Sequence, residues 1–314
     1  MKGKLLYLGC CLLGLLSVSS NSSPKTQYSP YVDRSYPTDV YWGDTHLHTS
    51  QSFDAYTFGT RKLGPEEAYR FAKGEVMTSS INGMQVRIRR PLDFLVVSDH
   101  AASMGVMNGL ERQDPDLLAS EVGKRWAPKL KAINEAAKID SAKAKELSIQ
   151  LFREGLSEGP VEEDEYRETV WKNIVSMADK HNDPGKFTAL IGYEWTAVFL
   201  MQHRVVIFKD GAEKVGQVIP FSQYDSLDPE DLWAYLKGYE QKTGGEVLAI
   251  PHSGDGSGGT MFALQNAKGV PFTKLYAKTR SRWEPLYEVT QMMGDSESHP
   301  VKPGSDESPL FTAL

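Results

Sequence analysis

Short apolar runs alternate with helix-like stretches along most of this chain. Apolar runs of strand length occupy residues 93–98, 187–193, 205–208 and 246–250, a shorter one occupies residues 40–42, and a run interrupted by polar residues occupies 286–291. Continuous runs of this kind are typical of strands that are buried on both faces of a sheet. Because such strands alternate with helices, the pattern predicts an α/β fold with a parallel sheet or barrel.

The stretches between these runs carry signals for helix starts and ends. Residues 64–72 open with Gly-Pro-Glu-Glu and stop just before Gly74, and residues 228–233 open with an Asp cap, a Pro and further acids. Proline in the first turn, acids near the N-terminus and a following glycine are typical helix boundaries. Residues 115–182 are rich in Ala, Lys, Glu and Arg, which predicts a helical excursion of two or more surface helices.

The first 20 residues have a pattern of their own. Lys2 and Lys4 are followed by an almost wholly apolar stretch to Leu16 and then by small residues. This stretch is too short to cross a bilayer, so it predicts a secretory signal peptide, with an uncleaved anchor as the alternative. Gly9-Cys10 is a weak match to a lipoprotein signal, because the apolar stretch continues past it. We therefore expect a secreted or periplasmic protein with no stable membrane insertion after signal cleavage.

Composition narrows the chemistry that remains. Residues 21–39 are rich in Ser, Pro, Tyr and Asn and predict a flexible tail, which leaves residues 40–314 as one domain. The net charge is −6 without a long basic run, which argues against nucleic acid as a partner. Both cysteines, Cys10 and Cys11, lie in the signal segment, so the mature chain has no thiolate ligand, disulfide or cysteine nucleophile. Any metal ion must therefore be bound by histidine and carboxylate.

Histidines and one acid stand where the apolar runs begin or end. The residues with this placement are His46, His48, His100, Glu194, His203 and His252. In α/β barrels the C-terminal ends of parallel strands converge on one rim, so ligands from distant positions meet there. His46 and His48 point the same way on an extended backbone, which suits a shared ion. Imidazole and carboxylate ligands favour Zn, Mn or Fe, and a carboxylate can bridge two ions.

Each of these pieces also has a purely structural interpretation. A single His-x-His is weak evidence for metal, Ser98-Asp99-His100 alone fits a strand-end turn, and Pro251-His252 alone fits a loop. Their joint placement at strand ends is what favours a divalent metal site.

Several longer segments resemble the DUF3604 family, whose members are relatives of the PHP (polymerase and histidinol phosphatase) metal-dependent phosphoesterases. The resemblance spans about residues 40–308, and no single segment is specific without the others. The matching segments are YWGDTHLHTS at 41–50, RPLDFLVVSDH at 90–100, GYEWT at 192–196, AIPHS at 249–253, RWEPL at 282–286 and GDSESHP at 294–300.

The resemblance implies a distorted PHP-like β/α barrel with two or three divalent metal ions on its C-terminal rim. The family usually has Asn where Val205 stands, which makes the nearby His203 the least secure of the implied ligands. Glu194 would bridge two ions. The full set of implied ligands is His46, His48, His100, Glu194, His203 and His252.

The chemistry implied by the resemblance is metal-assisted hydrolysis of a small anionic substrate such as a phosphate ester. Asp99 would orient His100, and Asp54 would be either a further ligand or an active-site acid. Arg61 and Arg282 are candidates for contacting the anionic substrate, with a surface salt bridge as the alternative for each.

One departure from the family pattern limits these expectations. Family members carry a late Asp-x-His motif that supplies metal ligands, and nothing in residues 253–314 matches it. With only six predicted strands, we expect a C-terminally truncated member whose barrel is incomplete. The alternatives are a catalytically inactive metal-binding remnant and an amidohydrolase-like barrel. The second is weakened because Ser98-Asp99-His100 comes early and no lysine stands at a strand end.

Overall fold

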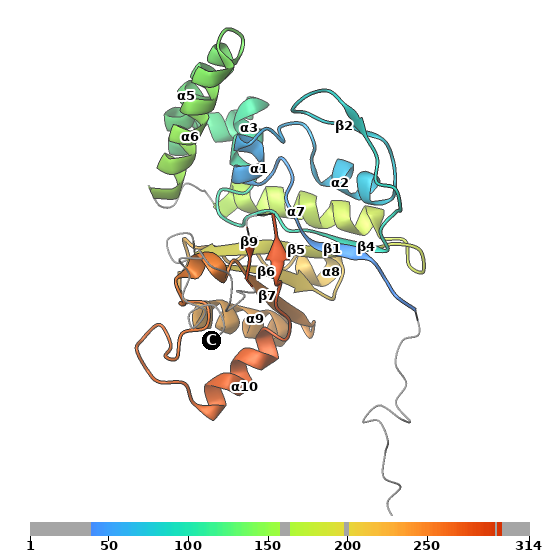
Figure 1. Ribbon diagram of the computed structural model, residues 1–314, viewed down its shortest axis with the longest axis vertical. Helices are drawn as coiled ribbons and strands as arrows, with labels where there is room; N and C mark the ends of the chain where they lie inside the picture. Colours follow the sequence, from blue (N-terminus) through green and yellow to red (C-terminus); the bar gives the residue numbers. More distant parts are fainter. Residues whose placement is uncertain (1–38, 158–163, 198–200, 293, 297–314) are drawn as a thin grey trace, which may run out of the picture. The chain divides into compact units, whose positions relative to one another are not determined.

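The computed structural model describes residues 39–157, 164–197, 201–292 and 294–296 (Figure 1). The chain divides into two units, Met1–Val40 and Tyr41–Leu314. The predicted signal peptide and nearly all of the predicted N-terminal tail lie outside the described residues and stay predictions. Among the described residues, no helix is both long enough and apolar enough to cross a membrane. The fold below is that of the second unit.

A mixed five-stranded sheet forms the centre of this unit. Its strands β1, β4 and β5 are parallel, whereas β6 runs antiparallel to both of its neighbours. The prediction of a parallel sheet was therefore wrong for β6. Parallel neighbours need a crossover of about a dozen residues or more, and only residues 198–201 separate β5 from β6. The order is β1 (Gly43–Leu47), β4 (Phe94–Val97), β5 (Thr188–Ala197), β6 (Gln202–Phe208) and β7 (Val247–His252).

The reversed direction of β6 matters for the position of His203. An antiparallel strand places its first residues at the end where its parallel neighbours finish. His203 accordingly pairs with Thr196 of β5 and with His252 of β7. The start of one strand and the ends of two others therefore meet at one end of the sheet.

Four of the six predicted strands are confirmed, and the predictions at residues 40–42 and 286–291 are corrected. Tyr41 and Trp42 are exposed, and the first strand begins only at Gly43, where pairing with β4 starts. Within residues 286–291 only β8 (Thr290–Gln291) is a strand, and it pairs with β9 (Gly294–Asp295) in a separate two-stranded sheet. The segment before β8 still contacts the main sheet, because the Glu288 backbone N–H donates to the Pro251 carbonyl at 3.0 Å.

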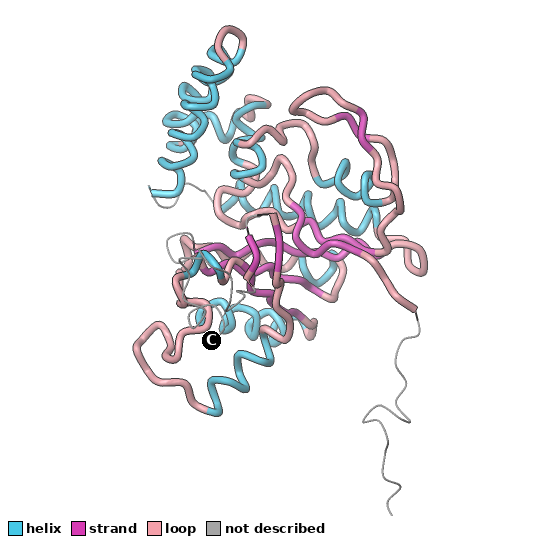
Figure 2. Tube along the Cα trace, in the orientation of Figure 1, coloured by secondary structure: helices cyan, strands magenta, loops and turns pink. Residues whose placement is uncertain are grey.

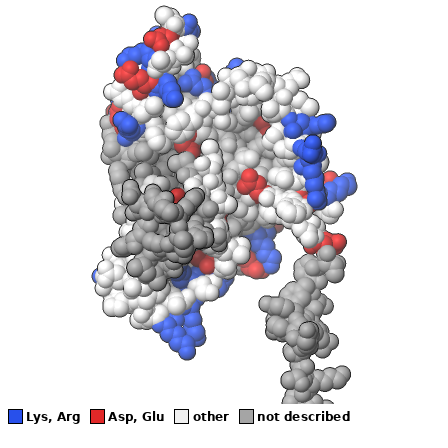
Figure 3. Space-filling model, in the orientation of Figure 1, with Lys and Arg blue, Asp and Glu red and all other residues white. Residues whose placement is uncertain are grey.

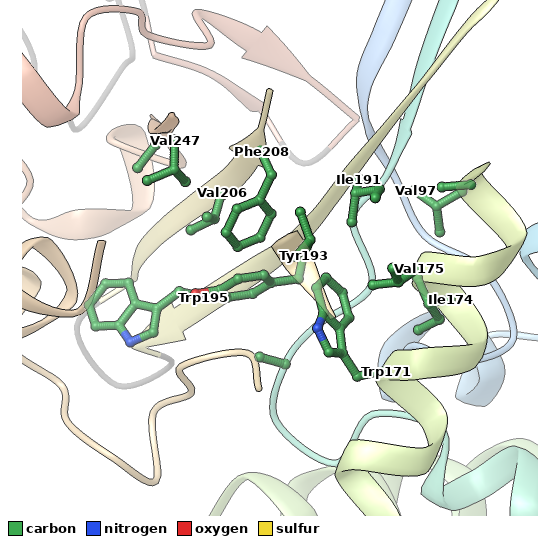
Figure 4. Close-up of a cluster of buried hydrophobic side chains, with 14 of the residues drawn as sticks. Val97, Trp171, Ile174, Val175, Ile191, Tyr193, Trp195, Val206, Phe208 and Val247 are labelled. Atoms are coloured by element: carbon green, nitrogen blue, oxygen red, sulfur yellow. The ribbon is translucent and has the colours of Figure 1, made fainter. Parts of the chain in front are cut away.

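Helices cover one face of the main sheet and form the larger core with it. Alternate strand residues point to this face, among them Tyr193 and Phe208, and both pack around the helix residue Trp171 (Figure 4). The Trp171 and Tyr193 rings are 5.9 Å apart and nearly perpendicular. Burying each such side chain stabilises the fold by about 1.5–3 kcal/mol. The helices with residues in this core are α2 (Pro65–Ala72), α7 (Asp164–His181), α8 (Ala212–Val215), α9 (Pro229–Thr243) and α10 (Lys274–Trp283).

The opposite face of the sheet carries a smaller apolar cluster and then the polar strand ends. Val96, Val205, Ile207 and Ile250 form this second cluster. The sheet curls as a half barrel, so that its edge strands β1 and β7 approach each other at one end, where the His46 and His252 ring centroids are 4.1 Å apart. The described strands do not pair β1 with β7 and so form no closed barrel.

Helices α5 and α6 form a pair beside the sheet, and together with the shorter helices α1, α3 and α4 they enclose a separate apolar core. Phe53 and Trp126 belong to this core, with ring centroids 5.4 Å apart. Lys, Arg, Asp and Glu side chains are interspersed over the outer surface of the pair, as expected of surface helices (Figure 3). The predicted helical excursion at residues 115–182 also contains α7, but α7 packs on the sheet. The elements here are α1 (Phe53–Thr57), α3 (Val106–Glu111), α4 (Pro115–Ala119), α5 (Glu121–Ala137) and α6 (Ser141–Ser157).

The remaining connections are mostly loops. Figure 2 shows that the chain between α2 and β4 is loop apart from one short hairpin. That hairpin is β2 (Met77–Thr78) with β3 (Gln85–Val86), and a 3₁₀ turn, η2 (Asp255–Ser257), follows β7.

Candidate metal centre

Five histidines surround one buried carboxylate at the end of the sheet where β1 and β7 approach each other. The carboxylate belongs to Glu194 on β5, which is 1% exposed. Neighbouring strand residues point to opposite faces, so Tyr193 and Trp195 enter the helix-covered core while Glu194 faces the other way. The structure thus brings together all six residues predicted as metal ligands: His46, His48, His100, Glu194, His203 and His252.

The two oxygens of Glu194 face different sets of imidazoles. Oε2 lies 3.2 Å from His46 Nε2, 2.9 Å from His48 Nε2 and 3.5 Å from His100 Nδ1. Oε1 lies 2.6 Å from His203 Nδ1 and 3.3 Å from His252 Nε2. An ion with four tetrahedral bonds of about 2.1 Å holds its ligand atoms roughly 3.4 Å apart. Three of the five separations, 3.2, 3.3 and 3.5 Å, are therefore close to those of ligands that share an ion.

His100 and Asp54 extend the cluster beyond Glu194. His100 Nδ1 is 2.6 Å from the Thr196 hydroxyl, and its Nε2 is 3.5 Å from Asp54 Oδ2. The other Asp54 oxygen is 3.2 Å from His48 Nδ1. Asp54 thus lies between two imidazoles. Ligand atoms lie within 4.8 Å of one another, close enough for one ion, in His46–His48–Glu194, His48–Asp54–His100, His100–Glu194–His203 and His46–His252–Glu288.

The electrostatics of the cluster favour ionised carboxylates. Burial by itself raises the pKa of Glu194, but the surrounding imidazoles, His100 and His252 foremost, outweigh it and hold that pKa well below its usual range. The pKa of Asp54 is lowered in the same way by His100 and His48 despite burial. Burial opposes a charge on His46, yet hydrogen bonds with Glu194 and Glu288 raise its pKa to about 9. Two carboxylates kept ionised within a histidine cluster suit a cation.

Three nitrogens in the cluster lack a hydrogen-bond partner among the described residues. They are His48 Nε2, His203 Nε2 and His252 Nδ1, and all three are buried, although His48 Nε2 lies 2.9 Å from Glu194 Oε2. Leaving a buried polar atom unsatisfied costs about 1–3 kcal/mol. A metal ion or an ordered water would satisfy such an atom, so these nitrogens are consistent with the metal-binding chemistry of the donor set.

Asp99 is placed differently from the prediction. Its carboxylate accepts hydrogen bonds from the Thr49 backbone N–H and, at 2.7 Å, from the Thr49 hydroxyl. Burial raises the pKa of Asp99 to about 6. It is Thr196, rather than Asp99, that holds the His100 ring. Asp99 therefore fixes the chain immediately after His48, because the end of β4 lies beside the end of β1.

The two arginine candidates are not brought to the cluster. Arg282 is about half exposed on α10, and its guanidinium donates to Glu240 of α9 at 2.6 Å. Arg61 donates to Asn134 at 2.6 Å and lies over the Tyr56 ring. The alternative, a surface salt bridge, describes Arg282, which pairs with Glu240, whereas the contacts of Arg61 are with Asn134 and Tyr56.

Sequence reasoning missed three side chains that contact the imidazoles. The Glu288 carboxylate lies 2.9 Å from His46 Nδ1, the Ser52 hydroxyl lies 3.0 Å from His48 Nδ1, and Thr196 contacts His100. Thr196 also donates to Glu194 Oε1 at 2.9 Å. Glu288 could have been noticed because it is an acid inside the apolar run 286–291. Thr196 could have been noticed because it stands two residues after Glu194 and so points to the same face of β5.

Four of the five imidazoles are partly exposed to solvent. The side chains of His46, His48, His100 and His203 are 14–16% exposed, whereas those of Glu194 and His252 are buried.

Comparisons with known proteins give one match. Neither the curated proteins nor the solved structures contain a match to this chain. The model of a protein family of unknown function, DUF3604, matches residues 35–313. The match covers most of the chain, and the protein therefore belongs to the DUF3604 family.

Proposed function

We propose that this protein is a metal-dependent hydrolase that acts on a small anionic ester, with phosphate esters as the favoured class. The observation that carries the proposal is the Glu194 carboxylate, whose two oxygens face different sets of histidines: Oε2 faces three of them and Oε1 faces the other two. A carboxylate shared in this way is typical of bridged two-metal hydrolytic sites. The resemblance to PHP phosphoesterases favours phosphorus over carbon as the centre that is attacked.

The residues of the cluster would hold two divalent ions, one on each oxygen of Glu194. His46 and His48 would bind one divalent ion with Glu194, and His203 and His252 would bind a second from the other oxygen. Zn, Mn and Fe all accept this set of ligands. When bound, such ions activate water as a nucleophile near neutral pH and stabilise the negative charge of the substrate.

Asp54 is placed to orient two of the imidazoles. It contacts His48 with one oxygen and His100 with the other, and its side chain is 30% exposed. As an ionised carboxylate it can accept a hydrogen bond from each ring and fix the orientation of both. Glu194 and Asp54 have only histidines as ion-pair partners among the described residues. That pairing leaves the local negative charge available for divalent cations.

The first test is metal binding by the full chain. The protein is stripped with a chelator, supplied separately with Mn, Fe or Zn, and its bound metal is measured after gel filtration. We expect stoichiometric binding that His48→Ala and His252→Ala each reduce. His181→Ala is the matched control, because His181 stacks on Tyr69, 5.5 Å between centroids, outside the cluster. Absence of bound metal after supplementation would refute the proposed site.

The second test is turnover of aryl phosphate monoesters and diesters by the loaded protein. We expect activity that requires metal and is lost in His46→Ala and His48→Ala but not in His181→Ala. Metal binding without turnover of any ester would support the alternative of a non-enzymatic metal-binding protein. Activity that survives in both His46→Ala and His48→Ala would refute the assignment of these ligands.

A further inference from the structure

The segment between α10 and β8 begins at a buried charge cluster. Glu284, the first residue after α10, is 9% exposed and accepts hydrogen bonds from Arg204 Nε and Trp233 Nε1, each at 2.9 Å. Arg280 Nε lies 3.0 Å from its second oxygen. Arg204 is itself 1% exposed on β6. Buried carboxylates with several charged and neutral donors hold a fixed position, so the start of the segment is anchored to the main sheet.

The segment then runs along the free edge of β7. The Glu288 backbone N–H donates to the Pro251 carbonyl at 3.0 Å, and the Gly254 N–H donates to the Tyr287 hydroxyl at 3.2 Å. These bonds place Glu288 at the open side of the half barrel, where the edge strands β1 and β7 approach. Its carboxylate oxygens lie 2.9 and 3.1 Å from His46 Nδ1 on β1.

His46 therefore has a different carboxylate at each ring nitrogen. Its Nε2 is 3.2 Å from Glu194 Oε2, and its Nδ1 faces Glu288. A neutral imidazole carries one proton, and the nitrogen without it is the one that binds metal. If the proton is on Nδ1 and donates to Glu288, the lone pair of Nε2 points toward Glu194 and His48.

We propose that Glu288 is a positioning residue that fixes the tautomer and orientation of His46, and that the buried Glu284 cluster holds Glu288 in place for this role. The proposal deepens and rests on the proposed metal-dependent function. In this proposal Glu288 contacts the metal ligand His46 and does not bind the ion itself. Carboxylates that accept the second N–H of a ligating histidine raise its basicity, and their loss weakens metal binding roughly 10–100-fold.

The first experiment tests the hydrogen bond without metal. Nitrogen-15 NMR of the metal-free full chain, at an alkaline pH where imidazole is neutral, reports which His46 nitrogen carries the proton. We expect the Nδ1–H form in the wild type and in Glu288→Gln, whose amide oxygen still accepts a hydrogen bond. We expect loss of that preference in Glu288→Ala. An unchanged His46 tautomer in Glu288→Ala would overturn the proposal, whether or not the protein binds metal.

The second experiment measures zinc affinity by competition with a chelator. For Glu288→Ala we expect an affinity roughly 10–100-fold weaker at an unchanged saturating stoichiometry, with partial recovery in Glu288→Gln. Loss of one equivalent of zinc at saturation would overturn the positioning role and would make Glu288 a ligand with His46 and His252, whose atoms also lie within 4.8 Å. A wild type that binds no zinc would refute the proposed function, while the tautomer result would still decide the role of Glu288.

The anchor is tested with a matched pair of variants. Glu284→Gln keeps the size of the side chain and an acceptor for Trp233 but removes the buried charge, so we expect weaker zinc binding and a weaker His46 Nδ1–H preference. Glu240→Gln is the control, because Glu240 makes an exposed contact with Arg282 between α9 and α10. Equal behaviour of the two variants would refute the anchoring role. Should Glu284→Gln fail to fold, the Glu288 variants still decide the main proposal.

Discussion

Replacement of Glu194 by glutamine is the change that separates a bridged two-ion centre from two independent sites. The amide keeps the size of the side chain but cannot provide two anionic oxygens. Oε2 contacts His46 and His48, and Oε1 contacts His203 and His252. We therefore expect Glu194→Gln to lose both metal equivalents, whereas His48→Ala and His252→Ala each lose one.

The size of the effect follows from linkage between binding and folding. A ligand at 100 times its dissociation constant stabilises the folded state by about 2.7 kcal/mol. For a domain of this size that corresponds to a rise of roughly 5–10 °C in the melting temperature for each site. Glu194→Gln should show none of this metal-dependent rise. Without metal it should also be about 3–5 kcal/mol less stable than the wild type, because buried histidines lose their charged partner.

The assay is thermal unfolding for the melting temperature and urea unfolding for the free energy, both followed by tryptophan fluorescence, of wild type, Glu194→Gln, His48→Ala and His252→Ala at increasing zinc concentration. His181→Ala serves as the control for the loss of a histidine outside the cluster. If Glu194→Gln keeps a metal-dependent stabilisation equal to that of the wild type, Glu194 does not bridge the site and the reasoning fails. If it keeps half, one ion binds without this carboxylate.

Three further predictions concern other parts of the molecule. Asp99→Ala should lower the free energy of unfolding by about 1–3 kcal/mol, because the Thr49 N–H and hydroxyl lose their buried acceptor, and equal urea midpoints for variant and wild type would contradict this. The folded-state pKa of His46, about 9, lies above its ordinary value of 6.5, so its stabilising contribution is complete below about pH 6.5 and is lost as the pH rises through about 9. Urea unfolding of the metal-free protein between pH 6 and 10 should show this loss, and His46→Ala should lack it. Trp171→Ala should cost about 3–5 kcal/mol by calorimetry, because its ring fills the core between α7 and the sheet, and a loss below 1 kcal/mol would mean that the site collapses around the cavity.

Much of the sheet and the set of clustered histidines could be predicted from the sequence because both depend on local signals. Leu95 to Val97 form a continuous apolar run, and His100 and His252 come directly after such runs. The direction of β6 was missed because it depends on the short connection after β5, which an apolar pattern does not reveal. Length of connection, rather than composition, was the informative feature there.

Contacts between distant residues account for the other differences. Glu288 and His46 are 242 residues apart in the sequence, and nothing near Glu288 indicates its partner. Asp99 precedes His100 in the chain, which suggested that it orients that ring, but its side chain accepts a hydrogen bond from Thr49, just after the neighbouring strand β1. Adjacency in the sequence is a poor guide to side-chain partners at a strand end, because successive residues there point in opposite directions.

The approach of the two edge strands has a consequence for how the protein folds. His46 lies on the first strand and is 148 residues from Glu194 and 242 from Glu288. During folding the chain must lose the entropy of loops of this length before the contacts at the cluster can form and stabilise it. Two ions joined through Glu194 would connect His46 of β1 to His252 of β7 and so act as a cross-link across the open side of the half barrel. We therefore expect metal to slow unfolding more than it speeds folding, and the edge strand β1 to exchange its amide hydrogens faster when the metal is removed.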